Sequence, residues 1–222
     1  MQDVITIVSG LPRSGTSMMM SMLEAGGLTA LVDQIRKADE DNPKGYYEFE
    51  QVKKIKEDDS WLDAAKGKAV KMVSMLLYNL PSDRNYKVIF MRRTMTEILS
   101  SQRTMLERTG QGTDVVDEEM GALFTRHLGE IEQWLAAHKN FEVLYVHYNN
   151  VIADPVHYAH HINRFMNHSL NEEKMVQAVD RALYRKRSEQ GQNDSAAPAT
   201  ASDDAADQEK IEEQLKALGY ME

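Results

Sequence analysis

Residues 9–17 form a short segment whose glycines, hydroxyls and arginine are suited to binding a phosphate group. Gly10 and Gly15 have the spacing of a Walker A loop, in which backbone N–H groups and a following helix N-terminus converge on an anion. Thr16 stands where that motif has lysine, while Ser17 adds a hydroxyl and Arg13 a permanent positive charge. Because the absent lysine would reach the β and γ phosphates of ATP, the segment predicts a phosphate-bearing ligand but disfavours a standard NTPase.

Alternating strand and helix patterns must position this loop. A β-branched run at 4–8 predicts a buried strand before the loop, and residues 16–25 predict a helix that stops at Gly26 and Gly27. The same patterns predict strands at 68–73, 86–91 and 141–146, and helices at 46–55, 94–108, 117–138 and 156–166. The alternation predicts an α/β fold, a three-layer sandwich with a central parallel sheet and ligands at the carboxyl ends of its strands.

Composition and charge narrow the class of protein. A chain of 222 residues with 42% hydrophobic residues can bury one sizeable core. It has no cysteine, no apolar run long enough to span a bilayer and no leader-like N-terminus, so we expect a cytoplasmic protein without a membrane segment or thiolate metal site. Nine acids and two bases lie in residues 188–222, which leaves the rest nearly neutral and without a basic stripe for nucleic acid.

The acidic end of the chain defines the expected domain boundaries. Residues 1–187 are predicted to form the α/β domain, 188–206 a flexible linker and 207–222 a short C-terminal helix. Ile211, Leu215 and Leu218 fall on one face of that helix. We expect removal of the chain after Arg187 to preserve nucleotide binding, unless this apolar face docks and the helix closes the site.

The loop also resembles a known family. Pro12, Arg13, Ser14, Gly15, Thr16 and Ser17 follow the pattern Pro-Lys/Arg-Ser-Gly-Thr-Thr/Ser of the 5'-phosphosulfate loop of sulfotransferases. The resemblance implies a sulfotransferase fold related to P-loop NTPases, with 3'-phosphoadenosine 5'-phosphosulfate (PAPS) as sulfuryl donor and 3',5'-bisphosphate (PAP) as product. It implies that the residues from Arg13 to Ser17 bind the donor and that no metal is required.

Two further stretches resemble the same family in the same order. The family binds the 3'-phosphate with an arginine at the end of a strand and a serine eight residues later, which Arg93 and Ser101 match. This register places Glu97 on the family's acidic position, although Arg92 and Ser100 have the same spacing.

The next stretch resembles the family's strand that ends in Tyr-Glu-Asp-Leu and continues to Asp-Pro. Tyr148 matches the tyrosine that lies near the adenine. Asn149 and Asn150 replace the family's acidic pair, which leaves any contact of those carboxylates without an equivalent.

Catalysis of sulfuryl transfer needs cations at the leaving group and a base at the acceptor. Arg13 stands at the family's loop lysine, and Lys71 resembles the strand lysine that cytosolic members place before a catalytic histidine. Val73 replaces that histidine, so histidine catalysis of that type is not expected. All seven histidines lie at position 127 or beyond and are interpreted as surface or structural residues.

Other members of the family use a glutamate between the loop helix and the next strand. Glu48 and Glu50 lie in that interval, and we favour Glu48 as the base, with a solvated surface charge as the alternative for each. The acceptor is predicted only as a hydroxyl or amine of a small molecule, carbohydrate or peptide. A nucleotide or small-molecule kinase with a degenerate loop, or a non-catalytic nucleotide-binding protein, stays open as an alternative function.

Overall fold

A computed structural model describes residues 4–33, 47–110, 116–180 and 204–221. Its centre is a four-stranded sheet in the order β2-β1-β3-β4, in which every neighbouring pair is parallel. The strands are β1 Ile5–Gly10, β2 Ala69–Val73, β3 Tyr86–Arg92 and β4 Phe141–His147. Almost every side chain of the first three strands is buried, as expected for a parallel sheet that is covered on both faces.

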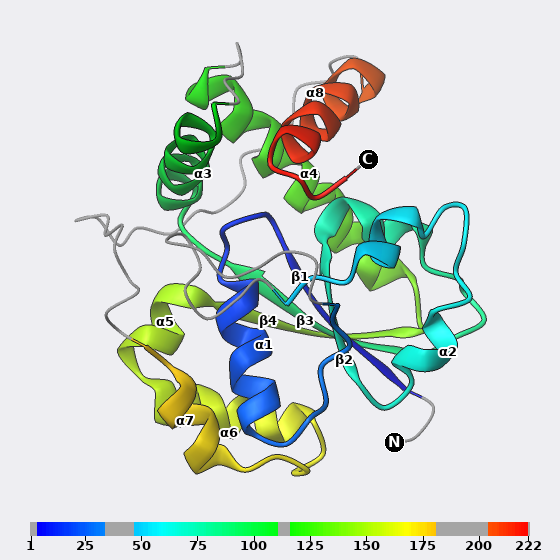
Figure 1. Cartoon of the computed structure of the whole chain (residues 1–222), viewed down its shortest axis with the longest axis vertical. Coiled ribbons are helices and arrows are strands. Elements are labelled where there is room, and N and C mark those ends of the chain that lie inside the picture. Colours follow the sequence, from blue (N-terminus) through cyan, green and yellow to red (C-terminus); the bar gives the residue numbers. More distant parts are fainter. Residues whose placement is uncertain (1–3, 34–46, 111–115, 181–203, 222) are drawn as a thin grey trace.

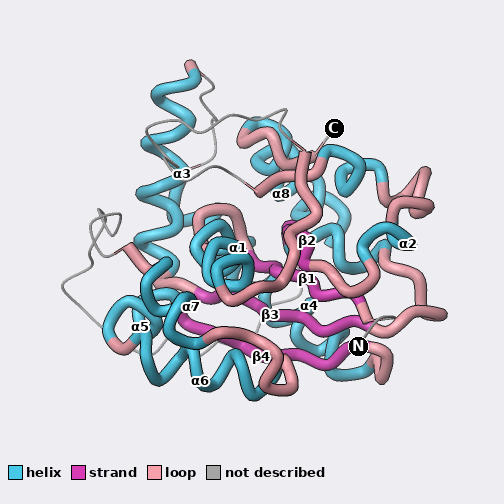
Figure 2. The backbone as a smooth tube through the Cα atoms, turned by 60° about the horizontal axis from the view of Figure 1, so that its bottom comes forward, coloured by secondary structure: helices cyan, strands magenta, loops and turns pink. Residues whose placement is uncertain are grey.

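Helices cover both faces of the sheet (Figures 1 and 2). One face is covered by α1 Thr16–Ala25, α5 Tyr148–Ala153, α6 Pro155–Phe165 and α7 Glu172–Ala178. The other is covered by α2 Leu62–Ala65, α3 Met95–Thr109, α4 Asp117–Ala137 and α8 Asp204–Ala217, with the 3-10 helices η1 Glu50–Lys54 and η2 Ser74–Asn79. The predicted α/β sandwich with a central parallel sheet is therefore confirmed.

The short elements account for most differences from the local prediction. The sequence predicts the start of a helix over 46–55, but among the described residues of this range, 47–55, only η1 forms, and it is a single 3-10 segment. The stretch after β4 turns at once into α5, because Tyr148, Val151 and Ile152 recur at helical spacing and bury their side chains. The elements α2, η2 and α7 were not predicted, because they have only four to seven residues each and carry little periodic signal.

The C-terminal helix docks on the domain. It begins at Asp204, within the predicted linker, and ends at Ala217. Ile211, Leu215 and Leu218 are 2–3% exposed and belong to the same hydrophobic cluster as the sheet. Most of the predicted linker lies outside the described residues. In the ranges that the structure describes, no helix combines the length and the apolar character needed to cross a membrane.

Candidate active site

The loop between β1 and α1 depends on two glycines with left-handed or extended positive backbone angles. Gly10 has φ 145°, and a Cβ there would lie 2.5 Å from the carbonyl oxygen of Met91 on β3. Gly15 has φ 101°, and a Cβ there would lie 2.4 Å from Cδ2 of Tyr148. Any side chain at either position would push the loop away from its neighbours, so glycine is required for this close approach.

The predicted donor-binding residues of the loop lie at the N-terminus of α1. Ser14 is buried, whereas Arg13, Thr16 and Ser17 are half-buried. Arg13 has φ 74°, a conformation that is uncommon outside glycine and that turns the chain sharply between β1 and α1. The side-chain hydroxyl of Ser14 is buried, and no hydrogen-bond partner lies among the described residues.

Arg93 links β3, the loop and α5. Its Nε donates to Oε2 of Glu97 at 2.8 Å, and its Nη1 donates to the backbone oxygen of Arg13 at 3.1 Å. Its guanidinium lies over the ring of Tyr148, 4.6 Å from the centroid. Asn149, which replaces an acidic residue of the family pattern, donates to both carboxylate oxygens of Glu97 at 3.2 Å. It therefore supports the ion pair between Arg93 and Glu97.

Arg13 and Ser101 were predicted for different phosphates but contact each other directly. The Nε of Arg13 donates to Oγ of Ser101 at 2.9 Å, across 88 residues of sequence. The alternative arginine, Arg92, faces away from the loop: it pairs with Glu132 on α4 at 2.5 Å and stacks on Tyr145. The loop therefore contacts Arg93 and Ser101, whereas Arg92 contacts α4.

Tyr148 closes the other side of the loop. Its ring packs against Gly15, and the residue is only 6% exposed at the start of α5. Burial raises the pKa of the Tyr148 hydroxyl, while the positive charge of Arg93 opposes that rise. The ring thus stays neutral at physiological pH and presents an apolar surface beside the loop.

Glu48 and Lys71 form a buried pair near the carboxyl end of β2. Nζ of Lys71 lies 3.4 Å from Oε1 of Glu48, and both side chains are less than 10% exposed. Glu50, the alternative base, pairs with Lys53 at 2.7 Å and is 31% exposed. Of these two carboxylates, only Glu48 combines burial with contact to the predicted cation.

A small recess that is open to solvent joins this pair to the phosphate loop. The loop contributes one wall through Gly10 to Pro12 and Thr16. The remaining lining residues are Glu48, Phe49, Val52, Lys53, Lys71, Met72, Val73, Leu76 and Tyr220. A group bound at the loop and a group bound in the recess would therefore be adjacent.

Three residues near β2 or the loop make long-range contacts that the sequence did not predict. Tyr220 lines the recess, and its ring centroid lies 5.6 Å from Nζ of Lys71. Gln102 donates to the backbone oxygen of Pro12 at 3.0 Å. His127 on α4 forms a 2.8 Å hydrogen bond with Ser74, and burial lowers its pKa to about 4. No local motif marks these residues, because each contact joins segments distant in sequence.

The fold is a parallel α/β sheet with a glycine-containing loop after β1, and comparison with known proteins identifies its family. The sulfotransferase domain family matches residues 3–215, so the chain belongs to the sulfotransferase domain family. The fold is similar to that of the sulfotransferase domain from the curacin biosynthetic pathway, with a TM-score of 0.51, 12% identity and coverage of 97% of each chain. No curated protein showed a significant match to the sequence.

Proposed function

We propose that the protein transfers a sulfuryl group from PAPS to a hydroxyl or amine of an acceptor bound in the recess. The observation that carries this proposal is that one loop contacts two different groups of predicted site residues. On one side it meets Arg93, Ser101 and Tyr148, and on the other it forms a wall of the recess that holds Glu48 and Lys71. Such an arrangement suits a donor nucleotide and an acceptor that must meet at the loop.

The residues at the loop fit the donor. The N-terminus of α1 and the hydroxyl of Ser14, which has no partner among the described residues, suit the 5'-phosphosulfate, together with Thr16 and Ser17. Arg93 and Ser101 suit the 3'-phosphate, because arginine presents several donors to phosphate oxygens. The ring of Tyr148 suits a position beside the adenine.

The chain's own residues can divide the chemistry between them. The bound donor supplies a sulfuryl group on a phosphate leaving group. Glu48 would accept the proton of the acceptor hydroxyl as the new bond from acceptor oxygen to sulfur forms. Lys71 and Arg13 would stabilise the negative charge that develops on the phosphate oxygen as its bond to sulfur breaks. No protonated histidine is needed for this division of roles.

Thermal stabilisation of the protein by nucleotides tests whether PAPS is the donor. PAP should raise the melting temperature much more than ADP or ATP, because only PAP can use both the loop and the site at Arg93 and Ser101. A ligand at a hundredfold excess over its Kd adds about 2.7 kcal/mol to the free energy of unfolding. Formation of a sulfated product from PAPS and a panel of hydroxyl and amine acceptors then tests the reaction. Equal stabilisation by PAP and ADP would contradict a 3'-phosphate site at Arg93 and Ser101. Stronger stabilisation by ATP than by PAP would favour a kinase.

A further inference from the structure

A buried side chain from α3 holds one peptide of the phosphate loop. Nε2 of Gln102 donates to the carbonyl oxygen of Pro12 at 3.0 Å, and Gln102 is only 1% exposed. The next residue is Arg13, whose φ of 74° is uncommon outside glycine. Because a trans peptide is planar, a bond that fixes the oxygen of Pro12 also fixes the direction of the Arg13 N–H. Gln102 therefore supports the unusual conformation at Arg13 from outside the loop.

A second buried glutamine, Gln214 on α8, fixes the orientation of Gln102. Nε2 of Gln214 donates to Oε1 of Gln102 at 3.1 Å, and Gln214 is 5% exposed. The carbonyl oxygen of Pro12 can only accept a hydrogen bond, so the amide nitrogen of Gln102 must face the loop and its amide oxygen must face Gln214. Oε1 of Gln214 has no hydrogen-bond partner among the described residues, so the bond to Gln102 is the one that a substitution of Gln214 would break.

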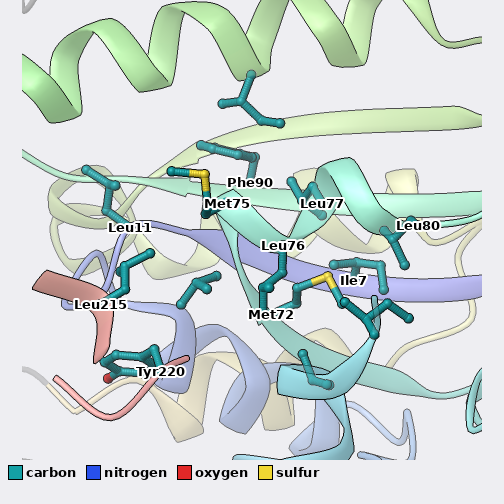
Figure 3. Close-up of a cluster of buried hydrophobic side chains, with 14 of the residues drawn as sticks. Ile7, Leu11, Met72, Met75, Leu76, Leu77, Leu80, Phe90, Leu215 and Tyr220 are labelled. Carbon is teal, nitrogen blue, oxygen red and sulfur yellow. The ribbon is translucent and has the colours of Figure 1, made fainter. Parts of the chain in front are cut away.

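Packing of α8 on the domain brings Gln214 to this position. Leu215 belongs to the same buried cluster as Leu11, the residue that precedes Pro12 in the loop, and Figure 3 shows both side chains. Near the start of the helix, Asp207 pairs with Arg126 of α4. These contacts place the amide of Gln214 beside Gln102, so the hydrogen-bond chain from α8 to the loop is complete only while α8 is docked.

Loss of this docking would change the loop as well as the helix. Without α8, Oε1 of Gln102 would lose its donor, and a buried amide oxygen without a partner is costly. The amide of Gln102 would rotate to find another donor, and Nε2 would leave the oxygen of Pro12, because both atoms belong to one planar group. The docking of α8 and the conformation of the Pro12–Arg13 peptide are therefore linked through one side chain.

We infer that Gln102 is a positioning residue of the donor site and that it couples the docking of α8 to donor binding at the phosphate loop. The inference rests on the proposed function, because PAP is the ligand whose affinity reports the conformation of the loop. Gln102 acts through the Pro12–Arg13 peptide, and Gln214 acts through Gln102. The C-terminal helix is thus a part of the donor site although it lies at the other end of the chain.

Calorimetric titration of the full chain with PAP tests the coupling. Methionine is the replacement, since it keeps the length of glutamine and packs in apolar surroundings without an amide. Gln102→Met and Gln214→Met should each raise the Kd of PAP about two- to tenfold, the range expected for one neutral hydrogen bond. The double variant should bind PAP no more weakly than Gln102→Met, because Gln214 acts through Gln102. Gln177→Met, at an exposed position of α7, is the matched control and should leave the Kd unchanged.

A pH profile separates the positioning role from a loss of stability, and it also serves if Gln102→Met does not fold. In Gln102→Glu only the protonated carboxyl can donate to the oxygen of Pro12. The ratio of its PAP Kd to that of the wild type should therefore be near one at pH 5.5 and should rise toward pH 8.5. A ratio that does not depend on pH would overturn the role of the Gln102 amide as a donor to the loop.

Hydrogen exchange of the ligand-free chain distinguishes failure of this inference from failure of the proposed function. Amides of residues 10–17 should exchange faster in Gln102→Met and Gln214→Met than in the wild type or in Gln177→Met. Faster exchange in both variants of a chain that has no affinity for PAP would refute the donor and keep the link between α8 and the loop. Wild-type exchange with an unchanged Kd in both variants would overturn the inference. Additive effects of the two substitutions would also overturn it, since Gln214 would then act independently of Gln102.

Discussion

Glu48 and Glu50 are two residues apart, yet their surroundings assign them different properties. Glu48 is buried beside Lys71, and Glu50 is paired with Lys53 at a partly exposed position. A base that acts on a bound hydroxyl must border the site, and among these two carboxylates only Glu48 lines the recess. The local geometry therefore supports the proposal of Glu48, which the sequence also favoured over Glu50.

Replacement of Glu48 by glutamine should lower turnover about a hundredfold to ten-thousandfold, the usual contribution of a general base. The Kd of PAP should stay nearly unchanged, because Glu48 borders the acceptor side of the loop. Steady-state kinetics with an acceptor that the wild type sulfates, together with calorimetry, measures both. Glu50→Gln is the matched control and should keep near-normal turnover. Loss of turnover in Glu50→Gln but not in Glu48→Gln would transfer the role to Glu50.

Arg93→Ala should abolish the preference for PAP over ADP. A hydrogen bond to a charged group contributes about 1.5–3 kcal/mol, so PAP affinity should fall roughly tenfold or more while ADP affinity changes little. The ratio of the two Kd values is the readout, because removal of Arg93 also leaves Glu97 buried without its ion pair and lowers stability.

Arg92→Ala provides the control for that ratio, since Arg92 pairs with Glu132 on α4. It should retain the wild-type preference for PAP. If Arg92→Ala lost the preference for PAP and Arg93→Ala kept it, the 3'-phosphate would be assigned to Arg92 and Ser100.

His127 should make the stability of the fold depend on pH below about 6.5. Burial lowers its pKa from 6.5 to about 4, so the unfolded chain binds the proton more readily than the folded chain between these values. The stabilisation is complete above pH 6.5 and is lost as the pH falls toward 4. It amounts to on the order of 3 kcal/mol.

Urea unfolding at pH 7 and at pH 4.5 measures this effect. His127→Gln keeps a side chain that can bond to Ser74 but cannot titrate, so the drop in the free energy of unfolding between the two pH values should be smaller than in the wild type. An identical drop in both proteins would show that other groups cause the acid sensitivity.

At the scale of elements, the loop is shaped by its close contact with α5. Gly15 combines a positive φ with a neighbour, Tyr148, that leaves no room for a Cβ. The conformation of the loop between β1 and α1 is therefore limited by α5, which packs against it. Donor binding and the packing of α5 should respond to the same substitution.

Gly15→Ala should weaken PAP binding and lower the melting temperature more than Gly27→Ala does. Both positions have a positive φ, which costs alanine about 1–2 kcal/mol, but a Cβ at Gly27 would meet nothing within 4 Å. The difference between the two variants isolates the clash with Tyr148. Thermal unfolding with and without PAP supplies the measurement, and equal effects of the two substitutions would argue against a tight contact between the loop and α5.

At the scale of the whole molecule, α8 belongs to the core. The expectation that the chain can be cut after Arg187 without effect on nucleotide binding is not supported by the docked helix. Its apolar face buries Ile211, Leu215 and Leu218, and Gln214 connects it to the loop through Gln102. The structure thus favours the alternative in which this helix closes the site.

Truncation after Arg187 should lower the free energy of unfolding by several kcal/mol, because each fully buried aliphatic side chain contributes about 1.5–3 kcal/mol. It should also reduce the stabilisation by PAP, since the loop loses the support of Gln214. Urea unfolding with and without PAP gives both values. Leu215→Ala in the full chain should cost about 2–5 kcal/mol and serves as the milder test. A truncated chain as stable as the full chain would mean that α8 adds no net stability.

The alternation of strands and helices, the position of the loop between β1 and α1 and the family could be predicted from the sequence alone. These features are local: the spacing of Gly10 and Gly15, the β-branched run of β1 and the arginine after β3 each lie within a short window. The bounds of α1 were predicted to the residue, since nothing within 16–25 breaks a helix and Gly26 follows it.

The tertiary structure decided which of the candidate side chains meet. The contact of Arg13 with Ser101, the pairing of Lys71 with Glu48 and the ring of Tyr220 beside that pair join positions separated by 88, 23 and 149 residues. Local periodicity specifies the face of an element but not its partner across the sheet. That partner depends on strand order and on the burial of apolar faces such as that of α8, which only the folded chain brings together.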